Sequence, residues 1–299
     1  MLKEMVVAKR NNIAVILNMI CLSASLSAQG VTPADIFNQT AATYAAMHTY
    51  KAAGTIVADT DMGNMKVSIT TSFSILLMKP NLYLISWSQK NMPAPPMVQD
   101  GTVWSDGIQP YLYMGIMKAY SKMSSDELAL ASATGVSGGA AFTIPWFFLR
   151  GDTPFSGLRD PVIEKTEQVE GEECYVISGT AARKETFWIS KSSHLILKYS
   201  HSLDTNGEDL VPPDITDVQL DEALKGMGQQ PTEETRKSMR EMMNGSQALI
   251  KNMKITGSST ETHTNISSPP LSHMDFQFAP PKDAVMKESL FDSLMSGAK

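Results

Sequence analysis

The chain has 299 residues, of which 42% are hydrophobic and 19% charged, and its formal net charge is −6. An acidic chain without a basic patch is a poor candidate for binding nucleic acids or anionic membrane surfaces. The length suits one large domain, and the sequence shows no internal repeat of fixed period.

The first 30 residues have the pattern of an export signal. Lys3, Lys9 and Arg10 precede an apolar run over residues 13–26, and small residues follow that run. The run is shorter than the roughly 20 apolar residues that a membrane-spanning helix needs. We therefore predict cleavage after Gly30, or two to three residues earlier, and a periplasmic mature protein. Removal of this segment shifts the net charge to −8, because it carries three basic side chains and one acidic one.

The two cysteines have different interpretations. Cys21 lies at the end of the apolar run, so a lipoprotein signal is an alternative, but Asn18, Met19 and Ile20 before it disfavour lipid attachment. Cys174 is the only cysteine left after cleavage, so an intrachain disulfide is excluded. Its apolar neighbours favour a buried strand thiol over a reactive nucleophile, since no histidine or asparagine follows at a catalytic spacing.

The mature chain opens with signals for a helix. Thr32 is a capping residue, Pro33 suits the first helical position, and Asp35 favours the positive end of the helix dipole. Strands are predicted next, beginning near residues 54–59. The longest has apolar residues at every second position, with one threonine among them: Val67, Ile69, Thr71, Phe73, Ile75 and Leu77. The residues between them are mostly polar. Such alternation predicts an antiparallel sheet with one apolar face.

The next segments are mostly hairpins with one helix. Lys79-Pro80-Asn81 predicts the turn of a hairpin, and Asp100-Gly101, after a proline-rich linker at residues 93–96, predicts another. Ser124 and Glu127 form a capping-box pattern for a short helix ending at Ala131. The glycines of residues 135–139 predict a flexible connection, since no Lys-Ser or Lys-Thr follows as in a phosphate loop. The aromatic run over residues 145–149 indicates burial or ligand contact.

The second half repeats the pattern. Strands are predicted over residues 162–203 and, after an insertion, over 253–264 and 272–278, and a short amphipathic tail contains Leu290, Phe291 and Leu294. Residues 204–247 change to a helical period, with Thr216 and Thr232 as capping residues. We predict a helical insertion in a single domain of residues 31–299. The insertion is either a lid or a decoration of the domain, and decoration is the preferred interpretation.

Three segments resemble the outer-membrane lipoprotein carriers, the LolA and LolB type of periplasmic protein. They are Lys79-Pro80-Asn81-Leu82-Tyr83, the strand pair from Phe187 to Lys198, and Phe276-Gln277-Phe278-Ala279-Pro280-Pro281 with its following turn. The resemblance covers most of residues 32–285. It implies an α+β fold, in which a curved antiparallel sheet forms an unclosed half-barrel with helices covering its concave face. In that family the concave apolar face accepts acyl chains.

The chain also departs from the compact carriers, through its greater length and the insertion. In these two features the chain is similar to the wider group of periplasmic relatives, which includes sensor domains built on the same fold. No functional residue of the carriers matches this sequence one to one. As ligand-binding residues we predict the apolar and aromatic side chains of the expected concave face, namely Phe73, Ile75, Leu77, Tyr83, Ile85, Trp87, Trp104, Trp146, Phe147 and Phe187.

The sequence favours binding over catalysis. The His194 and His201 pair and the His263 and His273 pair lack zinc-ligand spacing and indicate solvated or core-edge side chains. No nucleophile-elbow motif is present, and we predict no enzyme activity and no cofactor. The 20 methionines suit a surface that accepts varied apolar ligands, or alternatively fill gaps in a core. We predict a monomeric carrier for the acyl chain of a lipid or lipoprotein. A sensor or structural module that binds an envelope protein is the alternative, and a hydrolase is the weakest hypothesis.

Overall fold

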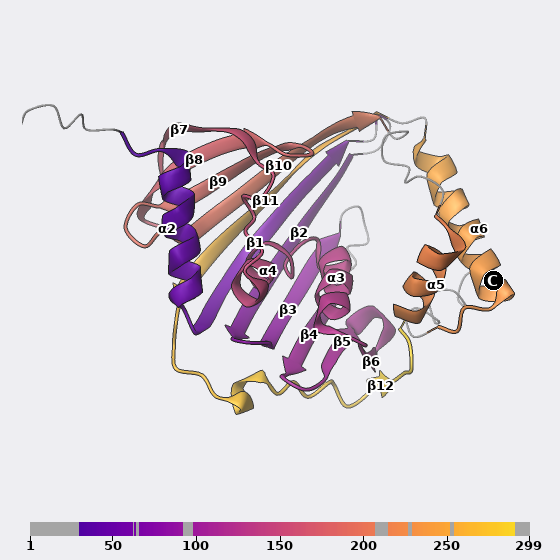
Figure 1. The fold of residues 1–299 in the computed structure, drawn as a ribbon. Helices are drawn as coiled ribbons and strands as arrows, with labels where there is room; N and C mark the ends of the chain where they lie inside the picture. Colours follow the sequence, from indigo (N-terminus) through magenta and orange to yellow (C-terminus); the bar gives the residue numbers. More distant parts are fainter. Residues whose placement is uncertain are drawn as a thin grey trace, which may run out of the picture.

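The computed structural model describes residues 30–61, 63, 66–91, 98–206, 215–226, 229–251 and 254–290. The predicted export signal up to residue 29, the proline-rich linker and most of the C-terminal tail lie outside these residues. The element numbering below follows Figure 1.

Within the described residues the chain forms one sheet and five helices. The strands are β1 (Thr49–Asp61), β2 (Lys66–Met78), β3 (Leu82–Asn91), β4 (Val98–Asp106), β5 (Pro110–Met114), β6 (Ala119–Lys122), β7 (Arg159–Val169), β8 (Glu172–Thr180), β9 (Lys184–Ser190), β10 (Ile196–Asn206), β11 (Lys254–Ser267) and β12 (Val285–Met286). The helices are α2 (Pro33–Ala46), α3 (Asp126–Ser137), α4 (Thr143–Arg150), α5 (Asp217–Gly226) and α6 (Glu233–Ile250), with short 3-10 turns η1 (Gly115–Met117) and η3 (His273–Phe276).

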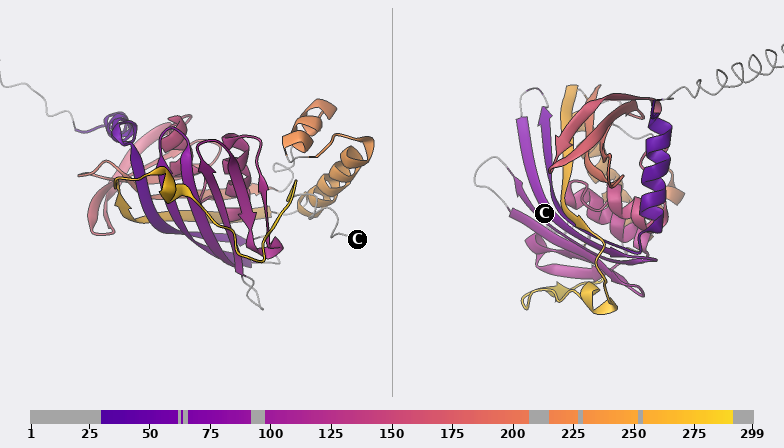
Figure 2. Two further views of the ribbon diagram at one scale, coloured as in Figure 1. Left: turned by 90° about the horizontal axis from the view of Figure 1, so that it is seen from below. Right: turned by 90° about the vertical axis from the view of Figure 1, so that its left-hand side faces the viewer.

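The sheet is curved and not closed. Its strand order is β12-β6-β5-β4-β3-β2-β1-β11-β10-β9-β8-β7, and every pairing is antiparallel except the short one between β12 and β6. Strands β7 and β12 therefore remain as the two edges. Figure 2 shows α2, α3 and α4 on the concave side of the sheet. The predicted α+β half-barrel with helices over its concave face is confirmed.

Strand β2 carries the alternation that the sequence predicts. Phe73, Ile75 and Leu77 are buried on the concave side, whereas Ser72 and Ser74 between them are exposed. The turn at residues 79–81 joins β2 to β3, as predicted, and the two strands pair in register from Met78↔Leu82 to Ile69↔Asn91. The first strand is longer than expected, because β1 pairs with β2 over its full length.

Helix α2 begins where the capping signals place it. The Thr32 hydroxyl accepts a hydrogen bond from the backbone N–H of Asp35, and the Asp35 carboxylate accepts one from the backbone N–H of Thr32 at 3.0 Å. This reciprocal pair satisfies two N–H groups that the first helical turn leaves without partners.

Two glycines sit beneath aromatic rings on neighbouring strands. The Phe73 ring covers Gly54 of β1, and the Trp87 indole covers Gly101 of β4. A β-carbon at Gly101 would lie 2.2 Å from the Trp87 ring. The predicted turn at Asp100-Gly101 is therefore wrong. Gly101 lies inside β4, and only a residue without a side chain leaves room for the Trp87 indole there. Sequence patterns do not distinguish a glycine in a turn from a glycine that makes room for an aromatic ring within a strand.

Two other predicted boundaries are also wrong. The residue that caps α3 is Ser125 rather than Ser124, since its hydroxyl accepts from the Leu128 N–H, and the helix runs on past Ala131 through Gly135. The strand predicted over residues 272–278 is the turn η3. There the Asp275 carboxylate accepts from the Ser272 N–H at 2.7 Å and closes a helical turn.

The insertion contains α5 and α6, which pack on each other. Leu220, Leu224 and Met239 form a small buried cluster that is separate from the main core. The Arg236 guanidinium binds both carboxylate oxygens of Asp221, at 2.6 and 2.8 Å. In Figure 1 the pair lies to one side of the sheet. The helix pair is thus held by its own contacts.

We expect the change Leu224→Asp to unfold this helix pair alone. The new Asp carboxylate would be buried without a partner in the small cluster, and this cost outweighs the free energy that burial of the cluster contributes. Circular dichroism would show a loss of helical signal, and the thermal unfolding midpoint of the sheet would stay unchanged. The exposed neighbour Ala223, changed to Asp, is the matched control. A fall in the midpoint of the sheet for Leu224→Asp alone would show that the pair supports the domain.

Candidate ligand-binding site on the concave face

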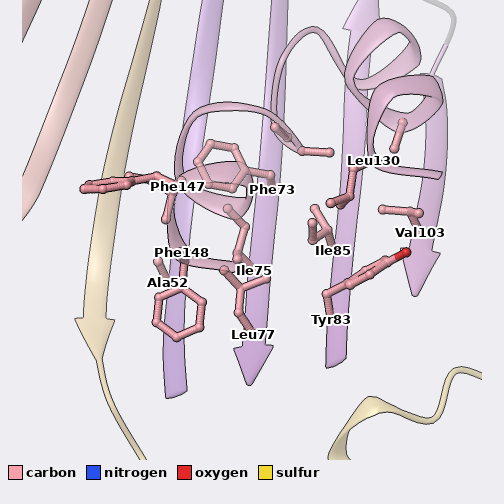
Figure 3. Close-up of a cluster of buried hydrophobic side chains, with 14 of the residues drawn as sticks. Ala52, Phe73, Ile75, Leu77, Tyr83, Ile85, Val103, Leu130, Phe147 and Phe148 are labelled. Atoms are coloured by element: carbon pink, nitrogen blue, oxygen red, sulfur yellow. The ribbon is translucent and has the colours of Figure 1, made fainter. Parts of the chain in front are cut away.

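Helices α3 and α4 cover the apolar half of the concave face. Side chains from β1 to β4 point toward Leu130 of α3 and toward Phe147 and Phe148 of α4 (Figure 3). Phe148 is 1% exposed and packs against the ring of Tyr50 at 5.9 Å. The apolar face predicted for ligand contact is therefore filled by the protein's own aromatic side chains.

Most of the predicted ligand-binding residues come together here. Eight belong to one buried cluster: Phe73, Ile75, Leu77, Tyr83, Ile85, Trp87, Phe147 and Phe187. Trp146 is partly buried at the margin of this cluster, and the guanidinium of Arg150 lies over its ring at 5.5 Å. Whether these side chains contact a ligand stays a prediction.

Trp104 does not join the other nine. It lies opposite Leu84 on the convex face, where its indole stacks on Tyr111 at 5.0 Å and packs against Phe278. The chain after β11 crosses this part of the convex face and covers it. Trp104 is buried there at 6% exposure, which explains why an aromatic residue sits on the face away from the helices.

A cleft of about 820 Å³ borders the covered face. Its walls are the start of α4, the loop at residues 153–156, the turn between β8 and β9, and β10. The lining side chains are mostly hydroxyls and charges, with Phe142 as the aromatic residue at its rim: Phe142, Thr143, Thr153, Pro154, Ser156, Ala181, Ala182, Arg183, Lys184, Glu185, Tyr199, Ser202, Asp204 and Thr205. Phe142 is 51% exposed.

A small group of buried polar side chains lies beside this cleft, on β11. Glu261 and His263 of β11 are buried, and Nε2 of His263 lies 2.8 Å from Oε1 of Glu261 without the directional geometry of a hydrogen bond. The other carboxylate oxygen accepts a hydrogen bond of 3.0 Å from the hydroxyl of Thr143, the first residue of α4. A buried carboxylate thus ties the helix cover to the sheet. Burial of such a group is costly unless it has partners.

Two buried tyrosines extend this polar group into the core. The Tyr50 hydroxyl lies 3.4 Å from Nδ1 of His263, and the Tyr44 hydroxyl accepts from the Ile196 N–H at 3.3 Å. Burial raises the pKa of Tyr44 and of Tyr50 well above the ordinary value, so both stay protonated at neutral pH. The tyrosines are therefore hydrogen-bond donors and acceptors here, not anions.

His201 of β10 and Glu185 of β9 are cross-strand neighbours. Burial lowers the pKa of His201 to about 4, and burial raises the pKa of Glu185. The Arg183 guanidinium lies 3.8 Å from the Glu185 carboxylate. His201 is consequently uncharged at neutral pH, and its Nδ1 has no hydrogen-bond partner among the described residues.

The lowered pKa of His201 makes stability depend on pH. The unfolded chain binds a proton near pH 6.5, whereas the folded chain does so only near pH 4. The contribution of His201 to the free energy of unfolding is therefore fully present above pH 6.5, and it is lost as the pH drops toward 4. Allowing for partial exposure of the ring, we expect a loss of about 1–2 kcal/mol.

Urea unfolding at several pH values measures this loss. His201→Gln removes the titrating ring and should flatten the curve between pH 6.5 and 4. His48→Gln, a change at an exposed histidine, should keep the slope of the wild type. Equal slopes in all three proteins would contradict the assignment to His201.

Sequence patterns missed this group of buried polar side chains. The histidines were predicted to be solvated or at the core edge, but His263 is 1% exposed. Glu261 and His263 alternate with threonines, so the apolar pattern that marks a buried face is absent from β11. Cys174 is fully buried as predicted, and burial raises the pKa of its thiol to about 11, which disfavours a nucleophilic thiolate.

Two further properties concern metals and membranes. Among the described residues, no group of three or more histidine, cysteine, aspartate or glutamate side chains is placed to hold a metal ion. None of the helices in the described part of the chain has the length and hydropathy of a membrane-spanning segment.

The sequence matches no family model and no curated protein. Solved structures do match. The lipoprotein LppX of Mycobacterium tuberculosis is 12% identical with a TM-score of 0.38, over 81% of this chain and 99% of LppX. A LolA superfamily protein from Nitrosomonas europaea is 12% identical with a TM-score of 0.29, over 83% and 99%. The MucA/MucB complex of Pseudomonas aeruginosa gives 11% identity and a TM-score of 0.28, over 82% of this chain and 60% of the matched chain.

Of these three, the Nitrosomonas europaea protein is the one described as a member of the LolA superfamily. With TM-scores below 0.5, the similarities do not carry a ligand or a partner over to this chain.

Proposed function

We propose that this protein is a non-catalytic periplasmic carrier for the acyl chain of a lipid or lipoprotein. The cleft of about 820 Å³ beside the apolar concave face is the observation that supports this function. Its volume falls in the range of sites for small organic ligands. Each methylene that leaves water for an apolar site contributes about 0.8 kcal/mol, so an acyl chain binds tightly without a charged contact.

The acyl chain would enter along the margin of α4. Phe142 stands exposed at the rim of the cleft, and Phe155 and Phe187 of the main cluster pack on each other at 5.0 Å behind it. Movement of the α4 side chains would then open the filled concave face to the acyl chain of the ligand. The apolar residues that the sequence predicted and that lie on the concave face would line this path.

Titration with a pyrene-labelled acyl lipid tests the proposal. We expect saturable binding by the wild-type protein and a loss of affinity of at least tenfold in Ala182→Trp, which fills the cleft. The matched control is Ala223→Trp on the surface of α5, which leaves the cleft free and should bind as the wild type does. No saturable binding, or equal binding by both variants, would overturn the proposal.

A second candidate function is a module that binds an envelope protein. The observation that favours it is the filled concave face, since α3 and α4 already occupy the space that a carrier would leave for its ligand. Strand β7 also ends the sheet with one unpaired edge, although two register shifts in its pairing with β8 make that edge irregular. A folded wild-type protein that binds no acyl lipid would favour this function.

A further inference from the structure

Hydrogen bonding is incomplete among polar side chains of β10 and β11 on the concave face. In the described part of the chain, Nδ1 of His201 has no hydrogen-bond partner. Oε1 of Glu261 and Nε2 of His263 face each other at 2.8 Å but lack hydrogen-bond geometry. A buried polar atom without a hydrogen bond costs about 1–3 kcal/mol. Three such atoms on two adjacent strands indicate a place where a polar ligand group would be stabilised.

The cleft gives access to these atoms. Thr143 lines the cleft and donates to Glu261, and Tyr199 lines it as the cross-strand neighbour of Glu261. Glu185 lines it opposite His201. Residues of the cleft wall are therefore direct neighbours of Glu261 and His201.

The cleft lining suits a neutral head group. Six of its side chains are hydroxyls, namely Thr143, Thr153, Ser156, Tyr199, Ser202 and Thr205. Its charges are two basic side chains, Arg183 and Lys184, and two acidic ones, Glu185 and Asp204. Such a balanced set gives no net attraction for an anion or a cation, and the hydroxyls donate and accept hydrogen bonds.

We propose that the ligand is an amphiphile whose uncharged head group carries hydroxyls, as in a monoacylglycerol, and that this head group binds Glu261 and His201. The inference rests on the proposed function. A ligand hydroxyl donates to Oε1 of Glu261 and pairs with Nδ1 of His201. A fatty-acid carboxylate only accepts hydrogen bonds, so it supplies no donor for Oε1 of Glu261.

A head-group series on the wild-type protein tests the inference. Displacement of a pyrene-labelled acyl lipid would be measured for monopalmitoylglycerol, palmitate and methyl palmitate, which share one acyl chain. We expect monopalmitoylglycerol to bind about tenfold more tightly than the other two, the effect of one additional hydrogen bond. Equal affinities, or tighter binding of palmitate, would overturn the inference and leave the carrier function standing.

Changing Glu261 to Leu adds a second test. This variant should lose about tenfold in affinity for monopalmitoylglycerol and keep its affinity for methyl palmitate, since only the hydroxyl contact is lost. Glu222→Leu, at an exposed position of α5, is the control and should match the wild type. An equal loss for both ligands would contradict the inference. If Glu261→Leu does not fold, the head-group series decides alone, and a wild-type protein that binds none of the three overturns the carrier function itself.

Discussion

Replacement of Gly54 by Ala is expected to cost about 3 kcal/mol of unfolding free energy, because the site has no room for a methyl group. A β-carbon at this position would lie 2.2 Å from the backbone oxygen of Thr262 and 2.3 Å from the Phe73 ring. Both neighbours would have to move. The Thr262 oxygen is part of the backbone of β11, so that strand itself would have to shift. The pairing between β1 and β11 joins the two halves of the sheet, so the whole fold would be weakened.

Urea unfolding of Gly54→Ala measures the loss. Gly135→Ala is the matched control, since Gly135 lies within α3 and a β-carbon there has no neighbour within 4 Å. The control should be as stable as the wild type or gain up to about 1 kcal/mol from the better helix former. A Gly54→Ala protein with wild-type stability would contradict the close contact with Phe73 and β11.

Truncation of Phe148 to Ala is expected to cost about 3–5 kcal/mol, the usual range for a large buried aromatic side chain. Phe148 is 1% exposed between the Tyr50 ring and the ammonium group of Lys79, which lies 4.8 Å from its centroid. The change leaves a cavity between α4 and the sheet. It should also increase the affinity for the labelled acyl lipid, if the concave face accepts an acyl chain.

Phe142→Ala serves as the control for this change. Phe142 immediately precedes α4 but is 51% exposed, so its truncation should alter the unfolding free energy by less than about 0.5 kcal/mol. Thermal and urea unfolding of both variants make the comparison. Equal losses would mean that α4 does not fill the concave face as described.

Elements with strong local signals were predictable from the sequence. The alternation in β2 identified its buried face, and Thr32 and Asp35 identified the start of α2. In both cases residues close in the sequence make the deciding contacts. The half-barrel was implied by the resemblance of whole segments, because no local pattern specifies how twelve strands curve.

Features that depend on distant contacts were not predictable. Gly101 was expected in a turn because its role depends on Trp87, which lies on another strand. Trp104 was placed with the concave aromatic residues, but Phe278, far along the chain, covers it on the other face. The burial of Glu261 and His263 was not predicted, because burial of polar residues requires partners such as Thr143, which the sequence does not connect to them.

The carrier function can be tested by mass spectrometry of an organic extract of the folded protein, purified from its own cells without detergent. We expect an acyl lipid to be extracted at about one equivalent per chain, as for a single site of this volume. A folded protein whose extract contains no acyl lipid, and which takes up none when it is offered, would contradict the carrier function.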